Sequence, residues 1–111
     1  MRLTLQVQLV LRTLLDDPDR ELYGLEFVDG TGLPPGTIYP ILARLESAGW
    51  IDSRWEEVDQ HEVGRPRRRY YRLTPDGTEQ ARDGLAAVAA RQRRTGGAAS
   101  RFATGGASWN G

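Results

Sequence analysis

The fold is decided by residues 33–49, LPPGTIYPILARLESAG, which read as a short helix with two unlike faces. Apolar residues recur at i, i+3, i+4 and i+7 and predict the buried face, and these are Ile38, Ile41, Leu42 and Leu45. The centre of the opposite face carries only short or small residues, namely Gly36, Pro40, Ala43 and Ser47. A helix face exposed to water usually carries long charged side chains. We interpret this low face as one that another surface approaches closely, and that surface as the major groove of DNA.

The segments before this helix complete a helix-turn-helix pattern. Residues 22–31 predict a short helix, whose end is marked by Gly30 and Gly32. The prolines that follow cannot continue a helix, but proline is preferred at the first helical position, so Pro35 can begin the next one. A helix, a tight turn containing glycine and a second helix form the helix-turn-helix arrangement.

The N-terminal segment contains two competing periodicities. Residues 3–9 alternate like a strand, whereas Val7, Val10, Leu11 and Leu14 form a longer helical stripe, so we predict a helix capped by Thr4. The leucines outside the stripe are Leu5 and Leu9. They either pack under a neighbouring helix of the same chain or form a contact between subunits.

The segments after residue 49 predict a two-stranded ribbon and a further helix. Residues 50–58 and 68–73 have the composition of strands, and the polar loop between them can close a hairpin. Thr74, Pro75 and Asp76 are typical of a helix start, and a thin stripe containing Ala81 extends that helix to about residue 94. Residues 95–111 are rich in Gly, Ala and Ser and predict a disordered tail, in which Trp109 is interpreted as an incidental apolar residue.

These elements predict a mainly α fold with a β-hairpin, a winged helix-turn-helix. The expected divisions are a DNA-binding domain at residues 1–74, a C-terminal helix for dimerisation at 75–94 and the tail at 95–111. At 111 residues the chain allows one domain, and its composition is that of a globular protein.

Four short motifs, in order, resemble the PadR family of bacterial transcriptional regulators. They are YGLE at 23–26, PGTIYPILARLE at 35–46, GWI at 49–51 and RYYRLTPDG at 69–77. The resemblance implies a homodimer held largely by the C-terminal helix, repression of transcription, and release from DNA by a small hydrophobic or aromatic effector. On this basis we expect dimerisation through Leu5, Leu9, Leu85 and Val88. The sequence departs from the family at Pro34, where a serine is common.

Charge is segregated although the net charge is zero, with fifteen basic residues, all arginine, against fifteen acidic ones. The first limb of the ribbon is acidic and contains Glu56 and Glu57, and the second is basic. We predict that the arginines of this wing bind DNA, and they are Arg65, Arg67, Arg68 and Arg69. The alternative is that Arg68 or Arg69 pairs with Glu56 or Glu57 across the hairpin, which contributes little.

The recognition helix supplies the other candidate contacts. Thr37 lies at its N-terminal end, where the helix dipole favours a phosphate, and Tyr39 can donate to a phosphate. Arg44 can bind a phosphate or a guanine edge, and Pro40 and Ala43 let the helix sit deep and touch thymine. As alternatives, Tyr39 is an aromatic residue at the edge of the core, and Arg44 pairs with an acid on its own helix.

Other kinds of site have little support in the sequence. Cysteine is absent, which excludes disulfides and thiol catalysis, and His61 stands alone in a predicted loop, so we expect no catalytic residue, no metal and no cofactor. Glu56 and Glu57 point to opposite faces of a strand. Trp50 and Trp55 are expected to pack in the core or hairpin. No apolar run approaches the ~20 residues of a membrane span, and no leader is evident, so we expect a cytoplasmic protein.

The prediction is therefore a dimeric regulator, a repressor that binds a double-stranded DNA operator. Two alternatives remain: a winged helix that binds proteins without binding DNA, and a sensor whose main event is capture of a small molecule.

Overall fold

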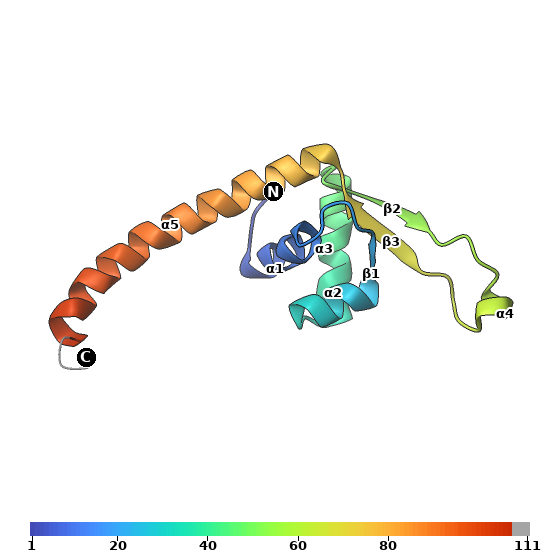
Figure 1. The fold of residues 1–111 in the computed structure, drawn as a ribbon, viewed down its shortest axis with the longest axis horizontal. Coiled ribbons are helices and arrows are strands. Elements are labelled where there is room, and N and C mark those ends of the chain that lie inside the picture. Colours follow the sequence, from blue (N-terminus) through green and yellow to red (C-terminus); the bar gives the residue numbers. More distant parts are fainter. Residues whose placement is uncertain (108–111) are drawn as a thin grey trace.

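The computed structural model describes the backbone of residues 1–107 and the side chains of residues 1–95. Three helices form the body of the molecule: α1 (Leu5–Leu15), α2 (Gly24–Thr31) and α3 (Pro35–Ser47). The wing consists of β2 (Ile51–Trp55), a short helix α4 (Gln60–Val63) and β3 (Arg69–Leu73), and α5 (Pro75–Ala107) follows. The wing and α5 project to opposite sides of the body, as Figure 1 shows. This arrangement confirms the mainly α winged helix-turn-helix expected from the sequence.

The helix boundaries follow from local capping. The Thr4 hydroxyl accepts a hydrogen bond from the amide of Val7 at 3.3 Å, which confirms the helical interpretation of this segment over the strand. Gly32 ends α2 with a left-handed φ of 74°, as expected of a C-terminal glycine. At the end of α3 the cap is Ala48, and Gly49 follows it with φ of 78°.

The sheet has three strands where a two-stranded ribbon was expected. Residues 22 and 23 form β1 (Leu22–Tyr23), which pairs with β3 in the antiparallel order β1-β3-β2. The expectation that the second helix begins at Leu22 was therefore wrong. Leu22 is buried opposite Tyr71, and the helix begins only after Tyr23, whose backbone amide donates to the Glu26 carboxylate.

The core combines one face of each main element. It contains the two predicted helical stripes, Val7, Val10, Leu11 and Leu14 from α1 and Ile38, Ile41, Leu42 and Leu45 from α3. Phe27, Ile51, Tyr71 and Leu73 complete it from α2 and the sheet. Burial of each large apolar side chain contributes roughly 1.5–3 kcal/mol, so these stripes fix how α3 lies on the body.

Helix α5 is longer than the sequence pattern indicated. The Thr74 hydroxyl accepts from the amide of Gly77 at 2.8 Å, which confirms the predicted N-terminal cap. The helix runs to Ala107 and not to residue 94, so the disordered tail was wrong for residues 95–107. No proline follows Pro75, and alanine is the strongest helix former, so the backbone can stay helical here although the segment also contains glycines, which disfavour helix. Trp109 lies outside the described residues.

The residues expected at a subunit interface differ in exposure. Leu5 is 65% exposed on α1, and Leu9 beside it is half-buried. Within the single chain Leu85 packs against the core and Val88 is only 5% exposed. In the described part of the chain no helix has both the length and the hydropathy needed to cross a membrane.

Candidate nucleic-acid interface

The outward face of α3 has the low relief that the sequence predicted. Its central residues are all exposed: Gly36, Pro40, Ala43 and Ser47. The opposite face is sealed in the core, where Ile38, Leu42 and Leu45 are fully buried. The centre of the outward surface therefore carries only short side chains over three turns. A helix with such a surface can enter the major groove of DNA.

Tyr39 lies at the margin of this face and leans on α2. Its side chain is half-exposed, and a Cβ atom at Gly24 would lie only 2.0 Å from the Tyr39 hydroxyl oxygen. Gly24 is the first residue of α2, so the phenol lies across the start of that helix. The Tyr39 side chain thus packs partly against α2 and is partly available for contact with another molecule. Thr37, near the N-terminal end of α3, is half-buried.

Arg44 is exposed, and no ion pair involves it among residues 1–95. The alternative of a pair with an acid on its own helix surface is therefore not seen. The nearby acid Glu46 instead accepts a hydrogen bond from the Ser53 hydroxyl at 2.5 Å and lies 3.9 Å from the Arg69 guanidinium. The Arg44 guanidinium is therefore exposed to solvent beside the short side chains of the outward face of α3.

The wing arginines have different partners. Arg68 stacks its guanidinium 4.0 Å from the centre of the Tyr23 ring, and Arg65 forms a two-point ion pair with Glu56. Arg69 lies 5.0 Å from the Trp55 ring. Arg67 is exposed, and its Nε donates to the Val58 carbonyl at 3.2 Å.

An ion pair does cross the hairpin, but it is not the pair of Arg68 or Arg69 with Glu56 or Glu57 that the sequence suggested. The side chains of Arg68 and Arg69 do not pair with Glu56 or Glu57; the partner of Glu56 is Arg65, at 2.7 Å. The Arg65 guanidinium, helped by the backbone amide of Arg68 and the Tyr70 hydroxyl, lowers the pKa of Glu56 to about 2. One of the four predicted DNA contacts is thus already engaged within the wing.

The outer face of the sheet, turned away from the helices, is covered by alternating aromatic and cationic groups. The Tyr23 and Tyr70 rings meet edge to face at 5.8 Å, and the Arg54 guanidinium lies 5.2 Å from the Tyr70 ring. Arg54 also binds Glu21 through two hydrogen bonds. These contacts tie β1 to the wing, so the wing and the start of α2 form one unit.

Trp55 is the residue at this interface that sequence reasoning missed. Trp50 packs partly against the core as expected, and Trp55 contacts Arg69 across the hairpin but remains 56% exposed. Trp55 lies on the same face of β2 as Ile51 and Ser53, four and two residues away. Trp55 lies at the end of the strand, however, where the helices no longer cover the sheet. The sequence pattern does not show how far this residue is from the core, so its exposure could not be predicted.

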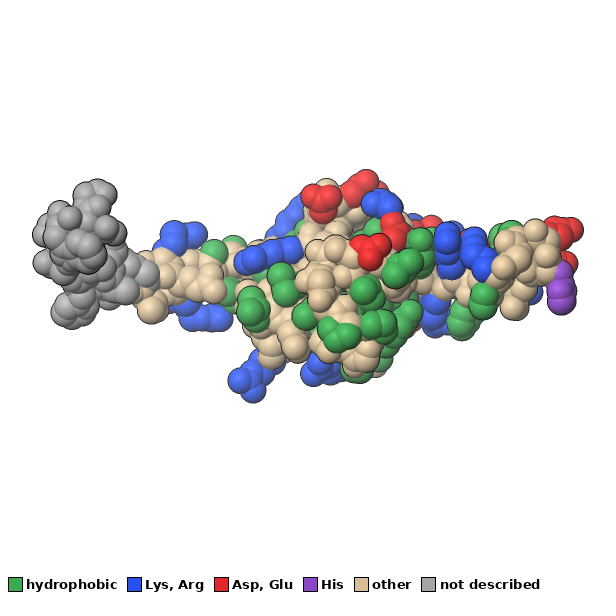
Figure 2. All heavy atoms as spheres, turned by 90° about the horizontal axis from the view of Figure 1, so that it is seen from below, with side chains coloured by type: hydrophobic (Ala, Val, Ile, Leu, Met, Phe, Trp, Pro, Cys, Tyr) green, Lys and Arg blue, Asp and Glu red, His purple; other side chains and the backbone are tan. Residues whose placement is uncertain are grey.

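Charge on the wing changes towards its tip. In Figure 2 basic side chains lie along the wing, and acidic side chains lie next to the histidine at its far end. The tip contains Glu57, Asp59 and Glu62, and an open hollow lies between the tip and Trp55. Within the described part of the chain no group of three metal-ligating side chains lies together. His61 is exposed on α4.

The sequence profile of the transcriptional regulator PadR-like family matches residues 14–83, which is more than half of the chain. The chain belongs to this family. The match spans α2, α3 and the wing and extends into α5. No protein of curated function matches the chain.

Solved structures of other proteins, two of them named as PadR proteins, share the architecture. The protein smu.1704 from Streptococcus mutans UA159 superposes with a TM-score of 0.69 at 25% identity, covering 86% of this chain and 87% of that one. A PadR family transcriptional regulator from Eggerthella lenta DSM 2243 gives 0.67 at 28% identity, covering 81% and 77%. Bacillus subtilis PadR in complex with operator DNA gives 0.60 at 21% identity, covering 74% and 48%, and shows the shared fold.

Proposed function

We propose that this PadR-like protein is a sequence-specific DNA-binding repressor that acts as a homodimer. One observation carries the proposal: the exposed face of α3 has short side chains and lies beside a wing that bears arginines. Phosphate contacts supply most of the affinity of such proteins, and contacts to base edges supply sequence choice. The protein acts in the cytoplasm, where the DNA is.

The α3 residues divide between these two roles. Pro40 and Ala43 line the part of the helix that enters deepest, where their apolar groups meet thymine methyl groups. Arg44 contacts a guanine edge or a phosphate from the same face. Thr37 and Tyr39 bind phosphates at the margin, and Gly24 lets the Tyr39 ring lie against α2.

The wing arginines also divide. Arg67 and Arg69 make the phosphate contacts, because Arg67 is exposed and Arg69 lies on the side of the wing nearest α3. Arg65 and Arg68 hold the wing in shape through Glu56 and Tyr23. The four wing arginines thus supply two DNA contacts and two contacts within the chain.

The dimer is proposed to form through the projecting part of α5, with Leu5 and Leu9 of α1. The high exposure of Leu5 supports this assignment, whereas Leu85 packs against the core and Val88 is already buried within its own chain. A two-fold dimer reads a two-fold operator, with half-sites about one helical turn, or ~10 base pairs, apart. A small hydrophobic or aromatic effector that binds beside α5 releases the DNA by changing this geometry.

The test is a titration of labelled DNA from upstream of the protein's own gene against a scrambled duplex at two salt concentrations. Preference for the native duplex that persists at the higher salt is the expected result. Arg67→Ala should weaken binding to both duplexes and reduce the slope of log affinity against log salt by about 1. Arg82→Ala is the matched control, because Arg82 is exposed on α5 and lines a hollow that also contains Asp19 and Asp52.

Two other outcomes contradict the proposal. Equal binding to both duplexes that disappears with salt means that the arginines bind phosphates without sequence readout by α3. No binding to either duplex favours the protein-interaction module. Repression and dimerisation are tested separately, by a reporter fused to the native duplex and by sedimentation of the free protein.

A further inference from the structure

Trp55 is exposed to an extent that its own chain does not explain. At 56% exposure it leaves much of a large apolar surface in water, although burial of an aromatic side chain is strongly favourable. Trp50, five residues earlier, packs partly against the core. The exposed indole lies on a paired strand and not on a loop, since Trp55 is the last residue of β2 and pairs with Arg69.

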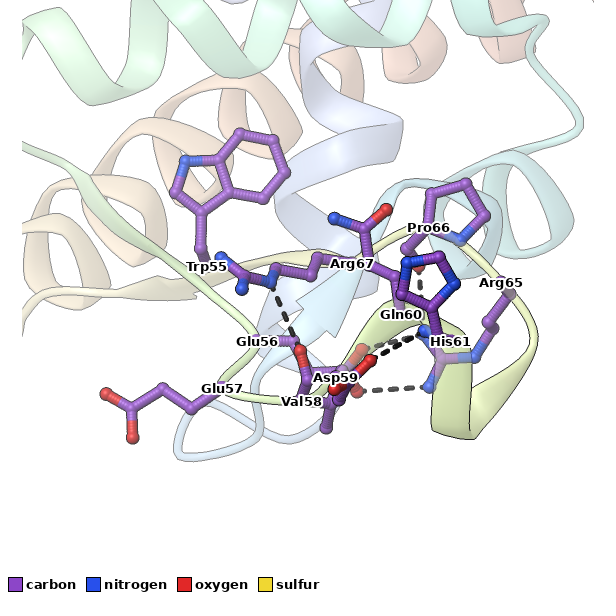
Figure 3. Close-up of a pocket in the computed structure, with 10 residues that line it drawn as sticks. All are labelled: Trp55, Glu56, Glu57, Val58, Asp59, Gln60, His61, Arg65, Pro66 and Arg67. Atoms are coloured by element: carbon purple, nitrogen blue, oxygen red, sulfur yellow. Dashed lines mark hydrogen bonds and ion pairs between the residues drawn. The ribbon is translucent and has the colours of Figure 1, made fainter.

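The indole is accompanied by cationic groups. The Arg69 guanidinium lies 5.0 Å from its ring, within the range of a cation–π contact. Arg67 lines the same hollow as Trp55, and Figure 3 shows both side chains on the rim of that hollow. An aromatic surface flanked by arginines is complementary to a ligand that alternates apolar and anionic groups.

The hydrogen bonds of the sheet show which way this cluster faces. Ser53 and Trp55 lie two residues apart on β2 and therefore on one face. The Ser53 hydroxyl donates to Glu46 of α3, and the Arg69 guanidinium lies 3.9 Å from the same carboxylate. Trp55 is consequently on the side of the wing that adjoins α3, and it continues the surface of that helix outwards.

We propose that Trp55, with Arg67 and Arg69, binds the sugar–phosphate backbone of duplex DNA. The indole packs on a deoxyribose ring, and the two guanidinium groups bind the phosphates on either side of that sugar. The bases of a duplex are stacked on one another, so the sugar is the apolar group that the strand offers here. This inference rests on the proposed function. It adds an uncharged contact, made by the indole, to the charged contacts already proposed between the wing and DNA.

The acidic tip of the wing supports this placement. Glu57 and Asp59 line the same hollow as Trp55 and Arg67, Glu62 follows on α4, and these carboxylates repel phosphates. Since the tip is unfavourable, a DNA strand following the wing is held nearer the body, at Trp55. The binding is independent of base sequence, because deoxyribose is the same in every nucleotide.

The experiment combines affinity and fluorescence, using the full chain. Trp55→Ala should weaken binding to the native and the scrambled duplex by the same factor, roughly fivefold, and leave the salt slope unchanged. Trp55→Phe should retain most of the affinity. Leu25→Ala is the matched control, because Leu25 is 57% exposed on α2. Thermal melting followed by circular dichroism checks that each variant is folded.

Tryptophan emission gives a second readout that does not depend on the alanine variant. Wild-type emission should change when DNA is added, and most of that change should be missing in Trp55→Phe. If the wild type binds DNA but both Trp55 variants match it in affinity and in emission change, this inference is overturned and the proposed function stands. If emission changes with free aromatic acids and not with DNA, Trp55 belongs to an effector site. If the wild type binds no DNA, the proposed function itself is wrong.

Discussion

Gly77 joins α5 to the body of the protein at a contact that has no room for a side chain. A Cβ atom at this position would lie 1.8 Å from the carbonyl oxygen of Trp50 and 2.5 Å from its carbonyl carbon. The obstacle is backbone, so it cannot rotate away as a side chain could. Gly77→Ala therefore requires the first turn of α5 to move off the sheet.

The magnitude follows from what that movement breaks. The Thr74 hydroxyl, which caps α5, also donates to the carbonyl of Gly49 at 2.8 Å, and loss of a cap costs about 1 kcal/mol. Overpacking destabilises the variant by a further ~1–3 kcal/mol, whereas the higher helix propensity of alanine stabilises it by about 1 kcal/mol. The net expectation is a loss of about 1–3 kcal/mol, or roughly 5–20 °C in Tm for a domain of this size.

Urea unfolding followed by circular dichroism measures this change, and Gly84 provides the control. A Cβ at Gly84 would meet only the Cδ1 end of Leu3, at 2.5 Å, and that flexible side chain can move. Gly84→Ala should therefore be nearly neutral or stabilising. Equal stability of the two variants would refute the argument that the Trp50 carbonyl determines how closely α5 packs.

Three further predictions concern the interface and the wing. Gly24→Ala should displace the Tyr39 ring and weaken DNA binding while changing the free energy of unfolding little, as a titration and a urea melt on the same sample will show. Replacing Glu57 and Glu62 with glutamine should raise DNA affinity, most strongly at low salt, because phosphate repulsion at the wing tip falls; an unchanged affinity would mean that DNA does not pass near the tip. The pKa of Glu56 is lowered from 4.5 to about 2, so its ion pair stabilises the fold above pH 4.5 and this contribution is lost as the pH falls towards 2. Urea melts across this pH range should therefore show a smaller loss of unfolding free energy in Glu56→Gln than in the wild type.

The parts of the fold that the sequence predicted are those fixed by local periodicity and capping. The stripe of Ile38, Ile41, Leu42 and Leu45 repeats over two turns, and only a helix can bury all four residues together. In contrast, β1 has two residues and no periodicity of its own. It exists because Leu22 and Tyr23 pair with β3, more than forty residues later in the chain, and no local pattern indicates such a partner.

The candidate site was predictable in composition but not in arrangement. The run of arginines indicated a basic wing, yet the partners of each arginine depend on the pairing of the two limbs across the hairpin. Arg65 meets Glu56 because the chain folds back through α4, a helix that the polar loop did not predict. The exposure of Trp55 likewise depends on how far β2 extends past the helices, which is a property of the tertiary structure.

The direct junction of the wing with α5 has a mechanical consequence. Only Thr74 separates Leu73 of β3 from Pro75 of α5, so the helix acts as a lever whose fulcrum is the contact between Trp50 and Gly77. Thirty-three residues at ~1.5 Å each give an arm of about 50 Å. A tilt of about 4° at the fulcrum moves the far end by about 3.5 Å, close to the ~3.4 Å rise of one base pair. In the proposed dimer, a small rotation at this joint therefore shifts the two recognition helices out of step with their half-sites by a whole base pair.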